Sequence, residues 1–176
     1  WSLMDDQVWM REALRAARRA WALGEIPVGA VVVQDGQKLS WGWNLRESRK
    51  DPLAHAEVLA LRRAARKVGD WRLEGADLYV TVEPCPMCAG ALLQARIRRL
   101  VYGTPNPRSG CAGSRLNLVD FPGMDHQVQV RGGVLEELCR ALVQRFFRDR
   151  RGLQDRDMER WQSPVECTRL EIEQGG

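Results

Sequence analysis

The sequence has no apolar run long enough to cross a bilayer as a helix, and it has only two histidines among its 176 residues. We therefore expect no transmembrane segment. The first three residues do not predict a signal peptide either, because Asp5 and Asp6 interrupt any hydrophobic stretch there. The five cysteines are an odd number and predict free thiols instead of a disulfide framework, which indicates a reducing compartment, the cytoplasm. No internal repeat is visible.

Lysine is also scarce, so the basic residues are almost all arginine. Together they number 27 against 23 acidic residues, a formal net charge of +4. Arginine makes bidentate contacts with phosphate and stacks on bases, so this bias is compatible with RNA binding. An ordinary solvated surface would have the same composition, and net charge alone does not decide between the two.

Two short stretches contain the residues that suggest chemistry: His55-Ala56-Glu57 and Pro84-Cys85-Pro86-Met87-Cys88. One imidazole and two thiolates are ligands that suit Zn²⁺. Three protein ligands leave one tetrahedral position open, as catalytic zinc sites do, whereas structural sites usually have four. Glu57 lies two residues after His55 and could approach a water at the open position without being a ligand.

Other interpretations of the cysteine pair remain open. Cys-x-x-Cys also occurs as a redox pair and as half of a structural zinc finger. A redox pair would not need His55 or Glu57. A closed structural site needs a fourth ligand, for which Cys111 is the best candidate, because His126 is far along the chain.

Both stretches also lie where helices should begin. Asp51-Pro52 precedes the first stretch, and apolar residues follow it at helical spacing. Pro86 occupies a favourable first-turn position in the second. Two helix N-termini would then point at one ion, and their dipoles would favour the thiolate forms of the cysteines.

Periodicity predicts alternating strands and helices along most of the chain. Helices are expected at residues 5–23, 56–68 and 87–95, with a short one at 116–119, and strands at 26–34, 39–43, 78–82, 98–103 and 128–130. Leu135, Leu138, Cys139, Leu142, Val143 and Phe146 define the core face of a last helix. Residues 45–53 and 104–113 are expected to be loops. Asp35-Gly36 predicts a hairpin, so the resulting α/β/α domain should contain a mixed five-stranded sheet.

His-x-Glu followed by Pro-Cys-x-x-Cys is similar to the signature of zinc-dependent nucleoside and nucleobase deaminases. Residues 25–30, 42–44, 51–57, 81–91, 110–114 and 146–148 resemble the bacterial tRNA-specific adenosine deaminases in particular, and the likeness extends from about Met4 to about Arg151. The resemblance implies the three-layer cytidine-deaminase-like fold, with strand order 2-1-3-4-5. We expect one deaminase domain at residues 4–151, an expression remnant at 1–3, and a polar, frayed or disordered tail at 152–176 in which Cys167 is exposed.

The resemblance also implies an activity: hydrolytic deamination of adenosine to inosine at the first anticodon position of tRNA. One Zn²⁺ per chain would be held by His55, Cys85 and Cys88, and Glu57 would move protons between water, the ring N1 and the departing amine. The residues expected to contact substrate are Val28, Asn44, Ala56, Pro84, Asn106 and Arg148. The expected partners are the anticodon stem-loop of tRNA, which the basic residues 145–151 would contact, and a second copy in a homodimer.

Simpler roles for these residues stay open. Glu57 could be a helix N-terminal acid that the dipole favours, Asn44 a turn or cap residue, and Asn106 the cap of the turn before Pro107. Bacterial relatives usually carry Asp where Asn106 stands. A neutral amide there would repel phosphates less, so we expect a smaller preference for ribose and detectable deamination of adenine in single-stranded DNA.

Two other functions also stay open. One is a deaminase on the same scaffold that acts on a free base or nucleoside, of guanine or cytosine type. The other is a non-catalytic, zinc-stabilised RNA-binding module. Ammonia release together with zinc content separates the last from the deaminases, and a panel of substrates separates the deaminases from each other.

Overall fold

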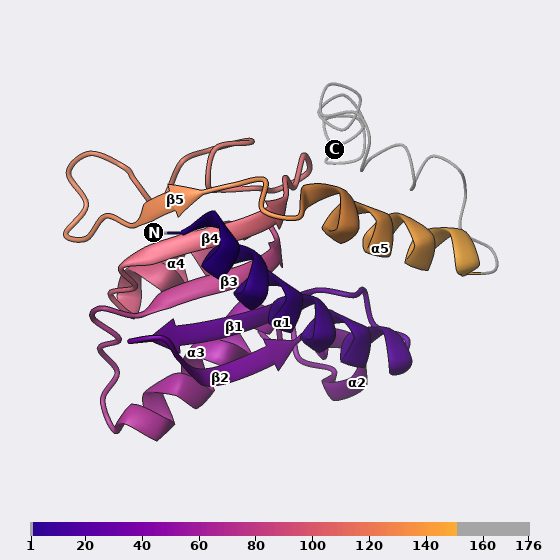
Figure 1. The fold of residues 1–176 in the computed structure, drawn as a ribbon, viewed down its shortest axis with the longest axis horizontal. Helices are drawn as coiled ribbons and strands as arrows, with labels where there is room; N and C mark the ends of the chain where they lie inside the picture. The colour runs from indigo at the N-terminus through magenta and orange to yellow at the C-terminus, as the bar shows by residue number, and fades with distance from the viewer. Residues whose placement is uncertain (1, 151–176) are drawn as a thin grey trace.

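The structure is a computed structural model that describes residues 2–150 (Figure 1). The predicted tail at 152–176, the exposed Cys167 and the RNA contact of Arg151 lie outside the described residues. The helices are α1 (Leu3–Ala22), α2 (Arg46–Arg49), α3 (Ala56–Val68), α4 (Pro86–Gln94) and α5 (Glu136–Asp149). None of the described helices is long and apolar enough to span a membrane.

The five strands form one mixed sheet, as predicted. They are β1 (Gly29–Gln34), β2 (Gln37–Trp43), β3 (Asp77–Val82), β4 (Arg99–Thr104) and β5 (Gln129–Arg131), in the order β2-β1-β3-β4-β5. β1 pairs antiparallel with both of its neighbours, and the β3–β4 and β4–β5 pairs are parallel. The hairpin between β1 and β2 turns at Asp35 and Gly36, whose φ angles of 51° and 72° fit the predicted tight turn.

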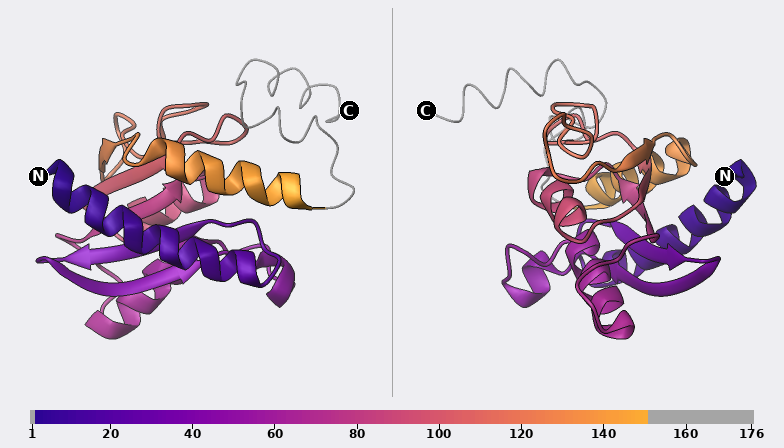
Figure 2. Two further views of the ribbon diagram at one scale, coloured as in Figure 1. Left: turned by 45° about the vertical axis from the view of Figure 1, so that its right-hand side comes forward. Right: turned by 90° about the vertical axis from the view of Figure 1, so that its left-hand side faces the viewer.

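Helices cover both faces of the sheet, which makes the three predicted layers (Figure 2). Successive residues of a strand point to opposite faces. Val32 therefore packs with α3 and α4 in one core, while Val31 packs with α1 and α5 in the other. This two-sided burial explains why β1 is apolar from Gly29 to Val33 instead of alternating.

Two glycines let a helix lie close to the sheet, one on each face. A Cβ on Gly29 would lie 2.0 Å from the carbonyl oxygen of Ala13 in α1, and one on Gly42 would lie 2.4 Å from that of Ala56 in α3. Neither approach is possible for a residue with a side chain. The beginning of α3, which carries the predicted site, is thereby fixed against β2.

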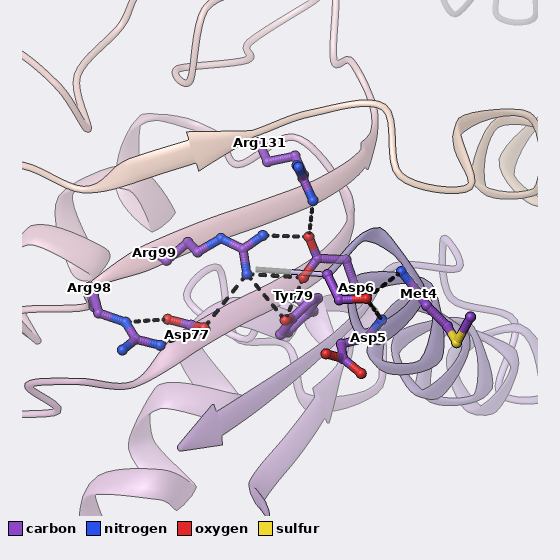
Figure 3. Close-up of polar contacts among 9 residues, drawn as sticks. Met4, Asp5, Asp6, Asp77, Tyr79, Arg98, Arg99 and Arg131 are labelled. Carbon is purple, nitrogen blue, oxygen red and sulfur yellow. Dashed lines mark hydrogen bonds and ion pairs between the residues drawn. The ribbon is translucent and has the colours of Figure 1, made fainter. Parts of the chain in front are cut away.

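A buried ionic cluster fastens the beginning of α1 to the sheet (Figure 3). The Asp6 carboxylate accepts hydrogen bonds from both terminal nitrogens of Arg99, from the Tyr79 hydroxyl at 2.8 Å and from Arg131 at 2.6 Å. Asp6 and Arg99 are 1% and 2% exposed. Ser2 caps the helix by accepting from the backbone of Met4, so α1 begins two residues earlier than predicted.

Three local predictions are wrong. Residues 116–119 are not helical, because Asn117 instead forms an isolated antiparallel bridge with Ala112. Residues 45–53 are not all loop, since they contain α2. Leu138 does not belong to the core face of α5 but is 49% exposed, at the groove between α1 and α5, while its neighbour Cys139 is buried.

Candidate active site

Three potential zinc ligands converge from the N-terminal ends of α3 and α4. His55 is the N-cap residue of α3 and Cys85 that of α4, with Pro86 at the first position and Cys88 in the first turn. The His55 Nδ1 atom lies 3.6 Å from the sulfur of Cys85 and 3.5 Å from that of Cys88. Within residues 2–150 these are the three residues that form a potential metal-binding group, and Cys111 is not part of it.

The three donor atoms fit a tetrahedral zinc ion. With zinc–sulfur bonds of about 2.3 Å and zinc–nitrogen bonds of about 2.0–2.1 Å, tetrahedral angles separate sulfur from nitrogen by about 3.5 Å. Both observed separations agree with this value. The ligand types and their spacing therefore suit Zn²⁺ held by three protein groups.

The two thiols differ in acidity. The pKa of Cys85 is lowered to about 4, first by the hydrogen bond from Cys88 and then by the nearby His55. The same hydrogen bond, together with burial, raises the pKa of Cys88. The pair on its own thus favours one thiolate, at Cys85, whereas a bound cation would favour deprotonation of both.

Glu57 lies beside this cluster in the first turn of α3. Its side chain is buried, 4% exposed, and burial raises its pKa to about 6. A carboxyl group with a pKa near neutrality can both accept and donate a proton at physiological pH, which is what a general acid–base catalyst requires.

A cavity of about 140 Å³ adjoins the cluster. Its lining residues are Ile26, Val28, Asn44, Arg46, His55, Ala56, Glu57, Val82, Glu83, Cys85, Asn106 and Ser109. Four of the predicted substrate contacts are among them. Pro84 is not a lining residue, and neither is Arg148, which is exposed at the end of α5.

The two asparagines of the cavity are held in place by local hydrogen bonds. Asn44 donates to the carbonyl of Ile26 at 3.3 Å and accepts from the backbone of Arg46 at 3.1 Å. The Asn106 side-chain oxygen accepts from the backbone of Arg108 and Ser109, at 3.2 and 3.3 Å. The simpler turn and cap roles are therefore present in the structure, and they orient both amides in the cavity wall.

Sequence reasoning missed the acids that shape this cavity. Glu25, 2% exposed, accepts from the Ser48 hydroxyl at 2.8 Å and so fixes α2, from which Arg46 reaches the cavity. Glu83, 1% exposed, accepts four hydrogen bonds from residues after β4. Glu83 precedes the Pro-Cys pair, but nothing local indicates partners more than twenty residues away.

Comparison with known proteins agrees with this geometry. A family model described as MafB19-like deaminase matches residues 4–151. The tRNA-specific adenosine deaminase of Bacillus subtilis (strain 168) is 44% identical over 85% of this chain and 92% of its own length. That of Haemophilus influenzae is 48% identical over 83% of this chain and 85% of its own.

A solved structure is also similar to this chain. It comes from work on A-to-I editing by tRNA:A34 deaminases at the wobble position of transfer RNA. It superposes with a TM-score of 0.73 at 41% identity, and covers 76% of this chain and 97% of its own. With relatives of this identity and coverage, and with the deaminase signature gathered around one cavity, the chain belongs to the family of tRNA-specific adenosine deaminases.

Proposed function

We propose that this protein is a zinc-dependent hydrolase that converts adenosine to inosine at the first anticodon position of tRNA. The observation that carries the proposal is the three-ligand cluster beside a buried acid, Glu57, at one cavity of a chain 44–48% identical to tRNA-specific adenosine deaminases. The overall reaction consumes water and adenosine and releases ammonia and inosine.

His55, Cys85 and Cys88 are the residues that would hold the metal. Zn²⁺ in such a site supplies Lewis acidity that makes a water molecule a nucleophile near neutral pH. Two thiolates and a neutral imidazole would cancel the charge of the ion, so this site should acidify water less than an all-histidine site would. The chain's own base therefore has a larger part in the reaction.

Glu57 is that base. It accepts a proton from the attacking water and passes it to N1 of the adenine ring, and it then carries the second proton of that water to the departing amine so that ammonia can leave. The burial that raises its pKa to about 6 supports this alternation between acceptor and donor. Its place at the N-terminus of α3 keeps the carboxyl in the lining of the cavity, within hydrogen-bonding reach of Cys88.

Asn44 would orient the base in the cavity, because an amide can pair with a purine edge. Asn106 would lie near the sugar-phosphate backbone of the same nucleotide. Val28 and Ala56 would contribute apolar contact from the cavity wall. A volume of about 140 Å³ suits one planar ring system, comparable with a cavity of about 150 Å³ that holds benzene. The target adenine would therefore have to leave its stack before it reacts.

RNA outside the cavity would contact the basic end of α5. Arg148 and Arg150 are exposed there, and neither is in an ion pair with a described carboxylate in the structure. A phosphate backbone is the natural partner for such a cluster. Pro84, although buried and not a lining residue, would help to shape the pocket through its backbone carbonyl, which accepts from the backbone of Cys111 at 2.8 Å.

A homodimer in the cytoplasm is the remaining part of the proposal. Trp71, 54% exposed, borders an apolar hollow with Leu61, Ala65 and Ala91 of α3 and α4, and a surface of this kind suits a second copy. Cys85, Cys88, Cys111 and Cys139 are free thiols, which suits a reducing compartment. Light scattering of the purified protein tests the dimer.

A substrate panel tests the proposed reaction. Zinc-loaded protein should release ammonia from a tRNA anticodon stem-loop that has adenosine at the first anticodon position, and much more slowly from free adenosine, cytidine or guanine. A stem-loop with guanosine at that position is the matched control. Faster turnover of free guanine or cytidine than of the stem-loop would contradict the proposal.

A further inference from the structure

A second buried carboxylate lines the cavity, and the proposed reaction does not use it. Glu83 follows the last residue of β3 and precedes the Pro84-Cys85 turn. Its side chain is 1% exposed, and its backbone nitrogen donates to the carbonyl of Thr104 at 2.9 Å. The carboxylate therefore lies between a predicted zinc ligand and the chain that follows β4.

Four hydrogen bonds reach this carboxylate from one loop, residues 104–114. The Asn106 backbone donates to Oε1 at 3.2 Å, and the Ser114 hydroxyl donates to the same oxygen. The backbone nitrogens of Ala112 and Ser114 donate to Oε2 at 3.0 and 3.1 Å. Each oxygen thus accepts two hydrogen bonds, and every donor is a neutral group of the 104–114 loop.

The loop backbone packs closely against the carboxylate at Gly110. A Cβ on Gly110 would lie 2.4 Å from Oε2, so the loop backbone lies directly against the charged group. After Thr104, which ends β4, the loop contains prolines and glycines and forms no strand or helix beyond one isolated bridge. Glu83 therefore supplies hydrogen bonds that the loop does not make within itself.

The bound loop in turn places two cavity residues. The backbone of Asn106 is held by Glu83, and the side chain of Asn106 accepts from the backbone of Ser109 and donates to its hydroxyl at 3.2 Å. Both Asn106 and Ser109 line the cavity. A displacement of the Glu83 carboxylate would therefore move the part of the cavity wall that Asn106 and Ser109 form.

We propose that Glu83 is a positioning residue, which holds the 104–114 loop so that Asn106 and Ser109 face the substrate. Its oxygens are fully engaged by the loop, so it does not transfer protons in the reaction. The two acids of the cavity have different roles. Glu57 moves protons, and Glu83 fixes the part of the cavity wall that Asn106 and Ser109 form. The effect on substrate preference rests on the proposed function, whereas the effect on the loop does not.

Amide hydrogen exchange tests the effect on the loop without any substrate. Glu83→Gln keeps the volume of the side chain but replaces one carboxylate oxygen with an NH₂ group. That group faces donors of the loop and cannot accept from them, so a buried N–H is left without a partner. Peptides covering residues 106–114 should exchange about tenfold faster, while peptides from α1 and the zinc content stay unchanged. Ser114→Ala, which removes one donor and keeps the carboxylate, should give a smaller change in the same peptides. Glu74→Gln, an exposed acid on the loop before β3, is the matched control and should change none.

A double-mutant cycle tests the effect on substrate. Glu83→Gln should lower kcat/KM for the stem-loop about 10- to 100-fold at full zinc occupancy. In the Glu83→Gln background, Asn106→Ala should lower kcat/KM little further, because the Asn106 side chain has already lost its orientation. The losses in kcat/KM caused by Asn44→Ala and Glu83→Gln should instead multiply in the double variant. Unchanged amide exchange rates at residues 106–114 in Glu83→Gln would overturn the proposal. It would also be overturned if the losses in kcat/KM multiply both for Glu83→Gln with Asn106→Ala and for Glu83→Gln with Asn44→Ala. A wild-type protein inactive on the stem-loop would contradict the proposed function alone, because the exchange result still decides the role of Glu83.

Discussion

The Asp6 cluster gives a quantitative prediction for stability. Asp6→Asn would leave Arg99, 2% exposed, with a neutral partner in place of a carboxylate. Removing one partner of a buried pair costs about 3–5 kcal/mol, because the remaining charge is left uncompensated. The retained amide oxygen and the weak contact of Arg99 with Asp77 at 3.7 Å place the expected loss near the lower end, about 3 kcal/mol.

Thermal melting of the zinc-loaded protein measures this loss. For a domain of this size, each kcal/mol lowers Tm by about 2–4 °C, so Asp6→Asn should melt about 6–12 °C below wild type. Glu137→Gln is the control, because it removes an ion pair with Arg140 in which Glu137 is 83% exposed, and it should change Tm by about 2 °C or less. A Tm for Asp6→Asn within that control range would refute the assignment of the cluster as a structural anchor.

The same cluster predicts a dependence of stability on pH. Burial would raise the pKa of Asp6, but the hydrogen bonds from Arg99, Tyr79 and Arg131 outweigh it, and the net pKa is lowered. A carboxyl with a lowered folded-state pKa contributes stability above its unfolded pKa, and this stability is lost as the pH falls toward the folded value. Wild type should therefore lose stability below about pH 4, and Asp6→Asn should lose less there.

Three further predictions concern the site and the RNA. Cys88→Ser should lose zinc and melt earlier, because metal binding is linked to folding; metal analysis that finds full occupancy would count against this ligand. Arg148→Ala should reduce the salt dependence of tRNA binding by about one in the log–log slope, and an unchanged slope would place the phosphate contacts elsewhere. Asn106→Asp should raise the ratio of RNA to DNA deamination on matched hairpins, since a carboxylate repels phosphates and accepts from a 2′-hydroxyl. Equal ratios would leave Asn106 as a turn residue.

The sequence predicted those parts of the structure in which the local residue pattern alone indicates where the side chains are buried. The apolar run of β1 predicted that strand, and Asp35-Gly36 predicted the hairpin to β2. The signature predicted that His55, Cys85 and Cys88 lie together, and the structure brings them together as a group that could hold a metal ion. The order of the strands came from the family resemblance, because periodicity does not encode which strands are neighbours.

What the sequence did not predict depends on contacts between distant residues. Glu83 lies in the 81–91 stretch that resembles the deaminases, directly before the Pro-Cys pair, but its hydrogen-bond partners are 23 to 31 positions later in the chain. The short helix α2 contains no apolar periodicity and is held from outside, by Glu25. Leu138 follows the helical period of α5, yet the position of α1 leaves it at a groove.

The proton-transfer role of Glu57 is the centre of the functional account, and one measurement tests it directly. Inosine formation at the first anticodon position of the stem-loop is compared between the wild type and Glu57→Gln, both at equal zinc content. The account predicts that the variant binds zinc and RNA as wild type does, while kcat falls by about 10²–10⁴. Turnover by Glu57→Gln within a few-fold of wild type would contradict the account.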